Sequence, residues 1–197
     1  MEVSSLTKPS LLTILTFLVL IFSHPLTTSS SKIPKTHTNF IKKSCNTTTY
    51  PSLCVKSLTR YAATVRSNSL KLCSAALTVA IQSTRSCYAT VSTLANWKDI
   101  SRPEALAVKD CIGDLKDAVY QLKQTVSAMG HLGEADREFQ WANAKTYASA
   151  AITDAETCVD GFLGREVNRN VKTKIRGCVS DVEKHMSNAL SLINHLY

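Results

Sequence analysis

Glycine and proline are scarce in this sequence, with 6 Gly and 5 Pro in 197 residues. An all-β sandwich or barrel needs a turn about every 8–12 residues, and such turns draw heavily on these two residue types. The scarcity argues against those folds, and equally against collagen-like and low-complexity disordered chains. Hydrophobic residues make up 44% of the chain, enough for one buried core, so we expect one domain with or without a targeting segment.

Motifs of the common enzyme classes are also missing. The sequence contains no G-x-S-x-G, P-loop or G-x-G-x-x-G motif. A zinc site is not expected, because there is no C-x-x-C pair or H-E-x-x-H and the 5 His are scattered. Asp110, Asp114 and Asp117 recur at helical spacing. Paired carboxylates can serve a glycosidase, but this spacing is more typical of a solvated helix face. We therefore expect neither catalysis nor a cofactor.

The charge balance is basic, with 23 Lys and Arg against 15 Asp and Glu, a net charge of +8 and a pI of about 9.2. Such a balance favours acidic partners in general: nucleic acid, anionic lipid, an acidic polysaccharide or an acidic protein face. The basic residues are dispersed along the sequence and no stripe of aromatic residues interleaves them, so nucleic-acid binding is not expected.

The first thirty residues have the pattern of a secretory signal peptide. Lys8 supplies the positive charge, and Leu11 to Phe22 form an apolar run of twelve residues, too short to span about 30 Å of hydrocarbon as a helix. Small and polar residues follow, with a cleavage site expected near 29–31. We predict a signal peptide over 1–30 and a secreted mature chain over 31–197, with no membrane association after processing and an unchanged net charge of +8.

The rest of the chain has a helical period, and no strand-like alternation competes with it. Ser101 and Glu104 have the spacing of a capping box. Short loops between long helices leave antiparallel neighbours as the only solution. We predict an all-α protein, an antiparallel up-down-up-down four-helix bundle over 69–196 with an N-terminal helical hairpin over 38–66. The expected helices are 38–45, 52–66, about 69–96, 101–130, 134–160 and 165–196.

The expected core positions form seams at 3-4 spacing. The first long helix contributes a seam that starts at Leu70 and passes through Cys73 and Cys87. The second is expected to bury Ala105, Val108, Ile112, Leu115, Val119, Leu122, Val126 and Met129. Because these seams can bury one another, we expect a filled core and a monomer when the protein is free.

Cysteines in a secreted chain indicate disulfides, and two bridges follow from position. Cys45 and Cys54 are nine residues apart across a break at Pro51, so a bridge would pin the two short helices together. Cys111 lies near the start of the second long helix and Cys158 near the end of the third. Those ends are adjacent in an antiparallel pair, which makes a second bridge natural.

The other three cysteines are harder to assign. Cys73 and Cys87 are fourteen residues apart on one helix, about 21 Å along its axis, and cannot pair with each other. We favour buried free thiols for Cys73, Cys87 and Cys178 over a third bridge from Cys178 to one of them. The sequence also has one glycosylation sequon, at Asn46.

Four segments and Trp141 together resemble the plant invertase/pectin methylesterase inhibitor family. They are F-I-K-K-S-C-N-T-T-T-Y-P-S-L-C (40–54), K-D-C-I-G-D-L-K-D-A-V-Y-Q-L (109–122), A-S-A-A-I-T-D-A-E-T-C-V-D-G-F (148–162) and S-N-A-L-S-L-I-N (187–194). The match covers essentially the whole mature chain. The resemblance implies a hairpin-plus-bundle fold with the same two bridges, and a non-catalytic plant cell-wall protein that inhibits a carbohydrate-active enzyme.

The resemblance also indicates which of the family's two target enzymes this protein inhibits. The Pro-Lys-Phe tripeptide of invertase-inhibiting members is absent, and the closing S-N-A-L-S-L-I-N is more similar to the methylesterase branch. In that branch the inhibitor lies across the pectin-binding cleft, and Thr157 matches a contact threonine, whereas Gly113 stands where an acidic residue is frequent. The expected partner-binding residues flank the second and third seams: Asp114, Asp117, Gln121, Thr146, Asp154 and Thr157.

Several functions stay open at this point. The first is an extracellular, apoplastic inhibitor that binds pectin methylesterase 1:1 and reversibly blocks its substrate cleft. The second is an inhibitor of acid invertase. A pectin-binding module is motivated by the net charge of +8, and a lipid carrier is the weakest alternative because the seams predict a core without a cavity.

Overall fold

The computed structural model describes residues 34–97, 100–163 and 167–197. The predicted signal peptide over 1–30 lies outside the described residues. Within the described part every regular element is a helix, and none of these helices is long and apolar enough to cross a membrane.

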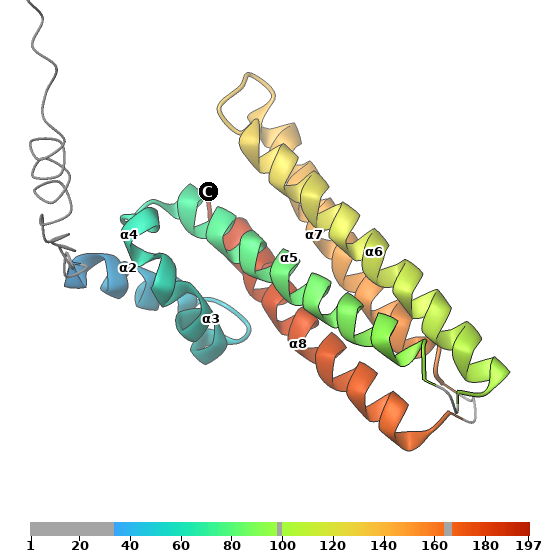
Figure 1. The fold of residues 1–197 in the computed structure, drawn as a ribbon. Helices are drawn as coiled ribbons and strands as arrows, with labels where there is room; N and C mark the ends of the chain where they lie inside the picture. The colour runs from blue at the N-terminus through green and yellow to red at the C-terminus, as the bar shows by residue number, and fades with distance from the viewer. Residues whose placement is uncertain (1–33, 98–99, 164–166) are drawn as a thin grey trace, which may run out of the picture. The chain divides into compact units, whose positions relative to one another are not determined.

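Four long helices make up the bundle (Figure 1). They are α5 (Ser69–Leu94), α6 (Arg102–Gly130), α7 (Arg137–Asp160) and α8 (Arg169–Asn194). Each packs against two others, in the cyclic order α5, α6, α7, α8 and back to α5. Consecutive helices are antiparallel, so the predicted all-α, up-down-up-down bundle is confirmed.

The predicted capping box starts α6 as expected. The Ser101 backbone N–H donates to Glu104 Oε2 at 2.9 Å, and the Glu104 N–H donates to Ser101 Oγ at 3.4 Å. Glu104 Oε1 also accepts from the backbone N–H of Asn168, the residue before α8. These hydrogen bonds hold the pKa of Glu104 below its usual value, and the one from the Asn168 N–H has the largest effect. One buried carboxylate therefore ties together the starts of two helices.

The seam of α6 matches the predicted one at Val108, Leu115, Leu122 and Met129, which are buried, and differs from it in between. Ile112 and Val119 are half-buried and Val126 is exposed, while the smaller Cys111, Ala118 and Thr125 are buried instead. The neighbouring face of α7 explains the shift. It is lined by Ala144, Ala148, Ala151, Ala155 and Cys158. Small residues on both helices allow a close approach that larger ones would prevent.

On α5, Leu70 was also expected inside but is 39% exposed, whereas Leu72 is buried.

The N-terminal hairpin is more broken than predicted. It contains α2 (Lys35–Cys45), α3 (Pro51–Leu58), a 3-10 turn (Thr59–Tyr61) and the short α4 (Ala62–Val65), where a single helix over 52–66 was expected. The hairpin then ends on two consecutive residues in the left-handed region, Arg66 (φ 47°) and Ser67 (φ 61°).

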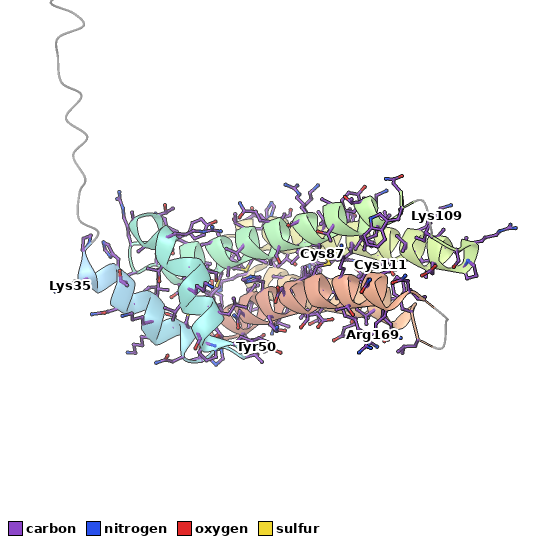
Figure 2. All side chains as sticks on the ribbon, turned by 60° about the horizontal axis from the view of Figure 1, so that its bottom comes forward. Lys35, Tyr50, Cys87, Lys109, Cys111 and Arg169 are labelled. Atoms are coloured by element: carbon purple, nitrogen blue, oxygen red, sulfur yellow. A yellow bond between two sulfur atoms is a disulfide. The ribbon has the colours of Figure 1, made fainter. Side chains whose placement is uncertain are left out.

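Asn188 of α8 joins the hairpin to the bundle. Its side-chain amide donates to the Tyr50 carbonyl at 3.0 Å and accepts from the Tyr50 N–H at 2.8 Å. Ser191, one turn further along, donates to the carbonyl of Thr47 at 3.3 Å. Tyr50 precedes α3 (Figure 2), so both ends of the 47–50 turn are anchored to α8.

Both predicted disulfides are present, with Cα–Cα distances of 5.6 Å for Cys45–Cys54 and 4.1 Å for Cys111–Cys158. The second joins α6 to α7.

The expectation of three free thiols is wrong for two of them. Cys87 of α5 is bonded to Cys178 of α8, with Cα atoms 5.3 Å apart. The pairing is possible because α5 and α8 are antiparallel neighbours, which brings residues 91 positions apart in the sequence to the same level. Cys73 is the free, buried thiol, and its burial raises its pKa to about 12.

Candidate functional site

The six predicted partner-binding residues lie on the adjacent helices α6 and α7. The Cys111–Cys158 bridge sets the antiparallel register, which places Asp114 close to the level of Asp154 and Gln121 close to that of Ala148. At about 1.5 Å per residue, the candidates from Thr146 to Thr157 occupy about 17 Å of α7. The close contact between the two helices therefore brings side chains from both into one surface.

Three carboxylates meet at this junction. The pKa of Asp114 is raised, first by partial burial and then by the carboxylates of Asp110, Asp154 and Asp117. The pKa of Asp154 is also raised, first by burial and then by Asp117. The mutual influence across the helix pair shows that Asp114, Asp117 and Asp154 form one cluster, which we call the acidic cluster. The neighbouring carboxylates therefore destabilise the ionised forms of Asp114 and Asp154.

Two oxygens at the junction have no hydrogen-bond partner among the described residues. They are Oε1 of Gln121 and Oδ2 of Asp154, which are themselves buried although each residue is only half-buried. A polar atom in this position is costly unless something donates to it. Both oxygens are shielded from solvent, so a donor outside the chain would reach them only if neighbouring side chains moved.

The two threonines of the predicted site are on the exposed side of α7. Thr157 and Thr146 are both exposed, and their hydroxyls donate to the carbonyls of Thr153 (2.8 Å) and Ala142 (3.0 Å), four residues earlier in the helix. With the protons used in this way, the hydroxyl oxygens can only accept further hydrogen bonds. The two threonines therefore add hydrogen-bond acceptors to this surface but no free donors.

The candidates occupy two parts of this helix pair. Asp114, Asp117, Gln121 and Asp154 share the junction, while Thr146 and Thr157 extend the surface along the outer side of α7. Asp110 belongs with the cluster through its effect on Asp114, although it was not among the predicted site residues. Its 3-4 spacing with Asp114 and Asp117 was the signal that could have included it.

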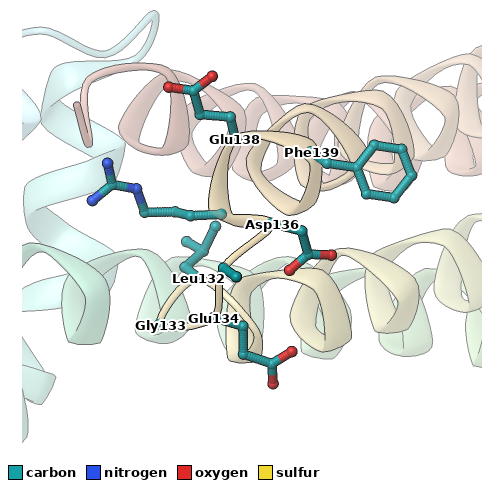
Figure 3. A pocket seen from close by; sticks show the side chains of 8 residues that line it. Leu132, Gly133, Glu134, Asp136, Glu138 and Phe139 are labelled. Atoms are coloured by element: carbon teal, nitrogen blue, oxygen red, sulfur yellow. The ribbon is translucent and has the colours of Figure 1, made fainter.

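A hollow lies at the connection between α6 and α7 (Figure 3). It is lined by Leu132, Gly133, Glu134, Ala135, Asp136, Arg137, Glu138 and Phe139. In the figure the carboxylates of Glu134, Asp136 and Glu138 point in different directions and do not converge on one point. Within the described ranges no group of three or more His, Cys, Asp or Glu side chains is placed to hold a metal ion.

Comparison with known proteins identifies the family. A family model described as plant invertase/pectin methylesterase inhibitor matches residues 39–192. "Pectinesterase inhibitor 11" of Arabidopsis thaliana is 36% identical over 189 residues, covering 91% of this chain and 94% of the relative. "Pectinesterase inhibitor 9" of the same plant is 39% identical over 186 residues, covering 90% and 91%.

The fold has a counterpart among solved structures. The crystal structure of a mutant form of a pectin methylesterase inhibitor from Arabidopsis aligns with a TM-score of 0.60 and 20% sequence identity, covering 80% of this chain and 97% of the other. At that identity the likeness concerns the fold alone. With a family match over 39–192 and relatives that align over nine-tenths of its length, the chain belongs to the plant invertase/pectin methylesterase inhibitor family.

Proposed function

We propose that this protein is a secreted inhibitor of pectin methylesterase. It binds the enzyme reversibly and 1:1 through the α6–α7 surface, covers the substrate cleft and carries out no chemistry itself. Family membership supports an inhibitory role, and the relatives at 36% and 39% identity carry names of pectinesterase inhibitors.

The acidic cluster at the junction between α6 and α7 is the observation that carries the proposal. Pectin methylesterase removes methyl esters from pectin and leaves carboxylates, so its cleft must accommodate an acidic polysaccharide product. A surface bearing Asp114, Asp117 and Asp154 is complementary to such a cleft. The acidic cluster would present carboxylates where the product's carboxylates otherwise lie.

A rigid scaffold suits inhibition by occlusion. Three disulfides brace the described chain, and one of them joins the two helices that carry the surface. Little conformational entropy is then lost when the surface docks, so more of the contact free energy contributes to affinity.

The proposal is tested by adding the purified mature chain to a plant pectin methylesterase and, separately, to an acid invertase, and measuring residual activity. We expect methylesterase activity to fall with added inhibitor and to level off at one inhibitor per enzyme, with invertase unaffected. Inhibition of invertase alone would place the protein in the other functional branch of its family. Inhibition of neither enzyme would contradict the proposal.

Secretion and glycosylation are part of the same proposal. The sequon residue Asn46 is exposed just after α2, where a glycan would meet solvent and leave the α6–α7 surface uncovered. Expression in plant cells should deliver the protein to the apoplast without residues 1–30. Treatment with a glycosidase specific for N-linked glycans should then lower its mass, and an Asn46→Gln variant should not respond.

A further inference from the structure

The outer face of α6 carries a regular row of cations. Arg102, Lys109, Lys116 and Lys123 follow one another at intervals of seven residues, and all four are exposed. An interval of seven rotates a straight helix by only about 20°, so the four side chains emerge on nearly one line. The 21 residues from the first to the last span about 31 Å at 1.5 Å per residue. We call these four residues the basic row.

Among the described residues the basic row has no ion-pair partner. Residues three or four positions away are the ones that could pair with them along a helix, and inside α6 none of these is acidic. They are Ala105, Leu106, Ile112, Gly113, Val119, Tyr120, Val126 and Ser127. Across the described chain the ion pairs within 4.0 Å are His131–Glu134 and Lys184–Asp181, so none involves the row.

Exposed apolar groups accompany the cations. Tyr120 is 58% exposed and stands between Lys116 and Lys123 in sequence, and Leu106 is 52% exposed beside Lys109. The Lys116 Nζ lies 5.8 Å from the ring centroid of Tyr88 on α5. Cations alternating with aromatic and aliphatic surface can attract a carboxylate and pack against the C–H face of a sugar ring.

The row is separate from the acidic cluster although both are on α6. Asp110 and Asp117 each follow a lysine of the row by one residue, and one residue turns the helix by about 100°. The acidic side faces α7, whereas Lys116 reaches towards α5. The basic residues that are dispersed in the sequence are therefore partly gathered on one face by the helix.

We propose that the basic row is a binding surface for a linear polyuronate. Evenly spaced cations over about 31 Å fit an extended polyanion better than a compact ligand. A membrane-surface helix buries its apolar face in lipid, but the apolar face of α6 is buried in the bundle, so lipid is the poorer fit. The choice of a polyuronate among extracellular polyanions rests on the proposed function. The surface would hold the protein on the wall polymer while the α6–α7 surface stays available to an enzyme.

Binding of a fluorescent oligogalacturonate, long enough to span the row, to the purified mature chain tests this proposal without any enzyme present. The test variant is Lys109→Gln/Lys116→Gln/Lys123→Gln. Its matched control is Lys42→Gln/Lys56→Gln/Lys71→Gln, which removes three equally exposed lysines from α2, α3 and α5. We expect the test variant to bind at least about tenfold more weakly, the control to change less than about twofold, and wild-type binding to weaken steeply with salt.

Equal losses in the two triple variants would show that only net charge matters and would overturn the proposal, as would a failure of the wild-type protein to bind. Fully methylesterified pectin should not bind, because it lacks carboxylates. Tighter binding to phosphatidylserine vesicles or to duplex DNA at the same salt concentration would also overturn it. Since the assay contains no enzyme, these outcomes are independent of whether the protein inhibits pectin methylesterase.

Discussion

The N-terminal hairpin and the α6–α7 pair are attached to the rest of the molecule in different ways. The hairpin packs apolar side chains such as Ile41, Leu58 and Val65 into the common core, and two hydrogen bonds between Asn188 and Tyr50 tie it to α8. The Cys45–Cys54 bridge lies within it. The α6–α7 pair has a bridge too, Cys111–Cys158, but its helices also meet along a continuous seam of small buried residues.

The difference bears on which polar positions can be substituted without loss of the fold. A buried polar link such as that between Asn188 and Tyr50 loses both of its hydrogen bonds when one side chain is substituted. A long seam spreads the stabilisation over many residues, so polar positions at its edge are free to change without loss of the fold. Asp114 and Asp154 occupy such edge positions.

Enlarging a seam residue should have the largest effect on stability. Ala151 is fully buried between α7 and its neighbours, so Ala151→Leu would overpack the closest helix contact and cost roughly 3 kcal/mol. Ala142→Leu, at an exposed position on the same helix, is the control and should be nearly neutral. Chemical denaturation followed by circular dichroism measures both, and equal stabilities would contradict the close packing of α6 and α7.

Removing the hairpin's polar anchor should have the next largest effect. Asn188→Ala leaves the Tyr50 N–H and carbonyl without their partners, at a cost of about 2 kcal/mol. Hydrogen exchange should quicken in α2 and α3 more than in α6 and α7. The control Asn194→Ala, at the exposed end of α8, should change neither quantity, and a loss below about 0.5 kcal/mol for Asn188→Ala would show that other contacts anchor the hairpin.

Neutralising Asp114 of the acidic cluster should have the smallest effect on stability, and it should raise stability where the other two substitutions lower it. The pKa of Asp114 is raised above 3.8, so the folded protein holds this proton more tightly than the unfolded chain does. Stability therefore falls as pH rises from 3.8 through the raised pKa and is lower by a constant amount at higher pH. Asp114→Asn removes this loss and should raise Tm at neutral pH by about 1–2 °C, a small change because solvent screens a partly exposed carboxylate.

The pH dependence supplies the control for this variant. The difference in Tm between wild type and Asp114→Asn should vanish below pH 3.8, where the carboxyl is protonated in both states. A variant that is less stable than wild type at neutral pH would show that the carboxylate makes a favourable interaction at the junction.

Much of the fold could be predicted from local signals in the sequence. The capping box at Ser101, the long helices and the bridges Cys45–Cys54 and Cys111–Cys158 depend on spacing along one helix or between adjacent ends. The third bridge, Cys87–Cys178, was missed because it requires the relative level of two helices 91 residues apart in sequence. The α6 seam was right at Val108, Leu115, Leu122 and Met129. It was wrong in between because hydrophobicity favoured Ile112 and Val119 over the small residues that helix packing selects.

The candidate site could be predicted only in outline. Spacing placed Asp114, Asp117 and Gln121 on one side of a helix, but the approach of Asp154 from α7 depends on how closely two alanine-lined helices pack. The basic row was overlooked because charges seven residues apart look dispersed in a linear sequence. That the six candidates contact an enzyme stays a prediction.

Inhibition by a Thr157→Trp variant tests the central claim most directly. Thr157 and Thr78 are both exposed and donate to a carbonyl one turn earlier at 2.8 Å, but Thr78 is on α5, away from the proposed surface. The measurement is the inhibition constant against pectin methylesterase for wild type, Thr157→Trp and Thr78→Trp, with Tm recorded for each. We predict that Thr157→Trp weakens inhibition at least tenfold, about 1.4 kcal/mol, with Tm nearly unchanged, while Thr78→Trp inhibits like wild type. Full inhibition by a well-folded Thr157→Trp variant would contradict docking through the α6–α7 surface.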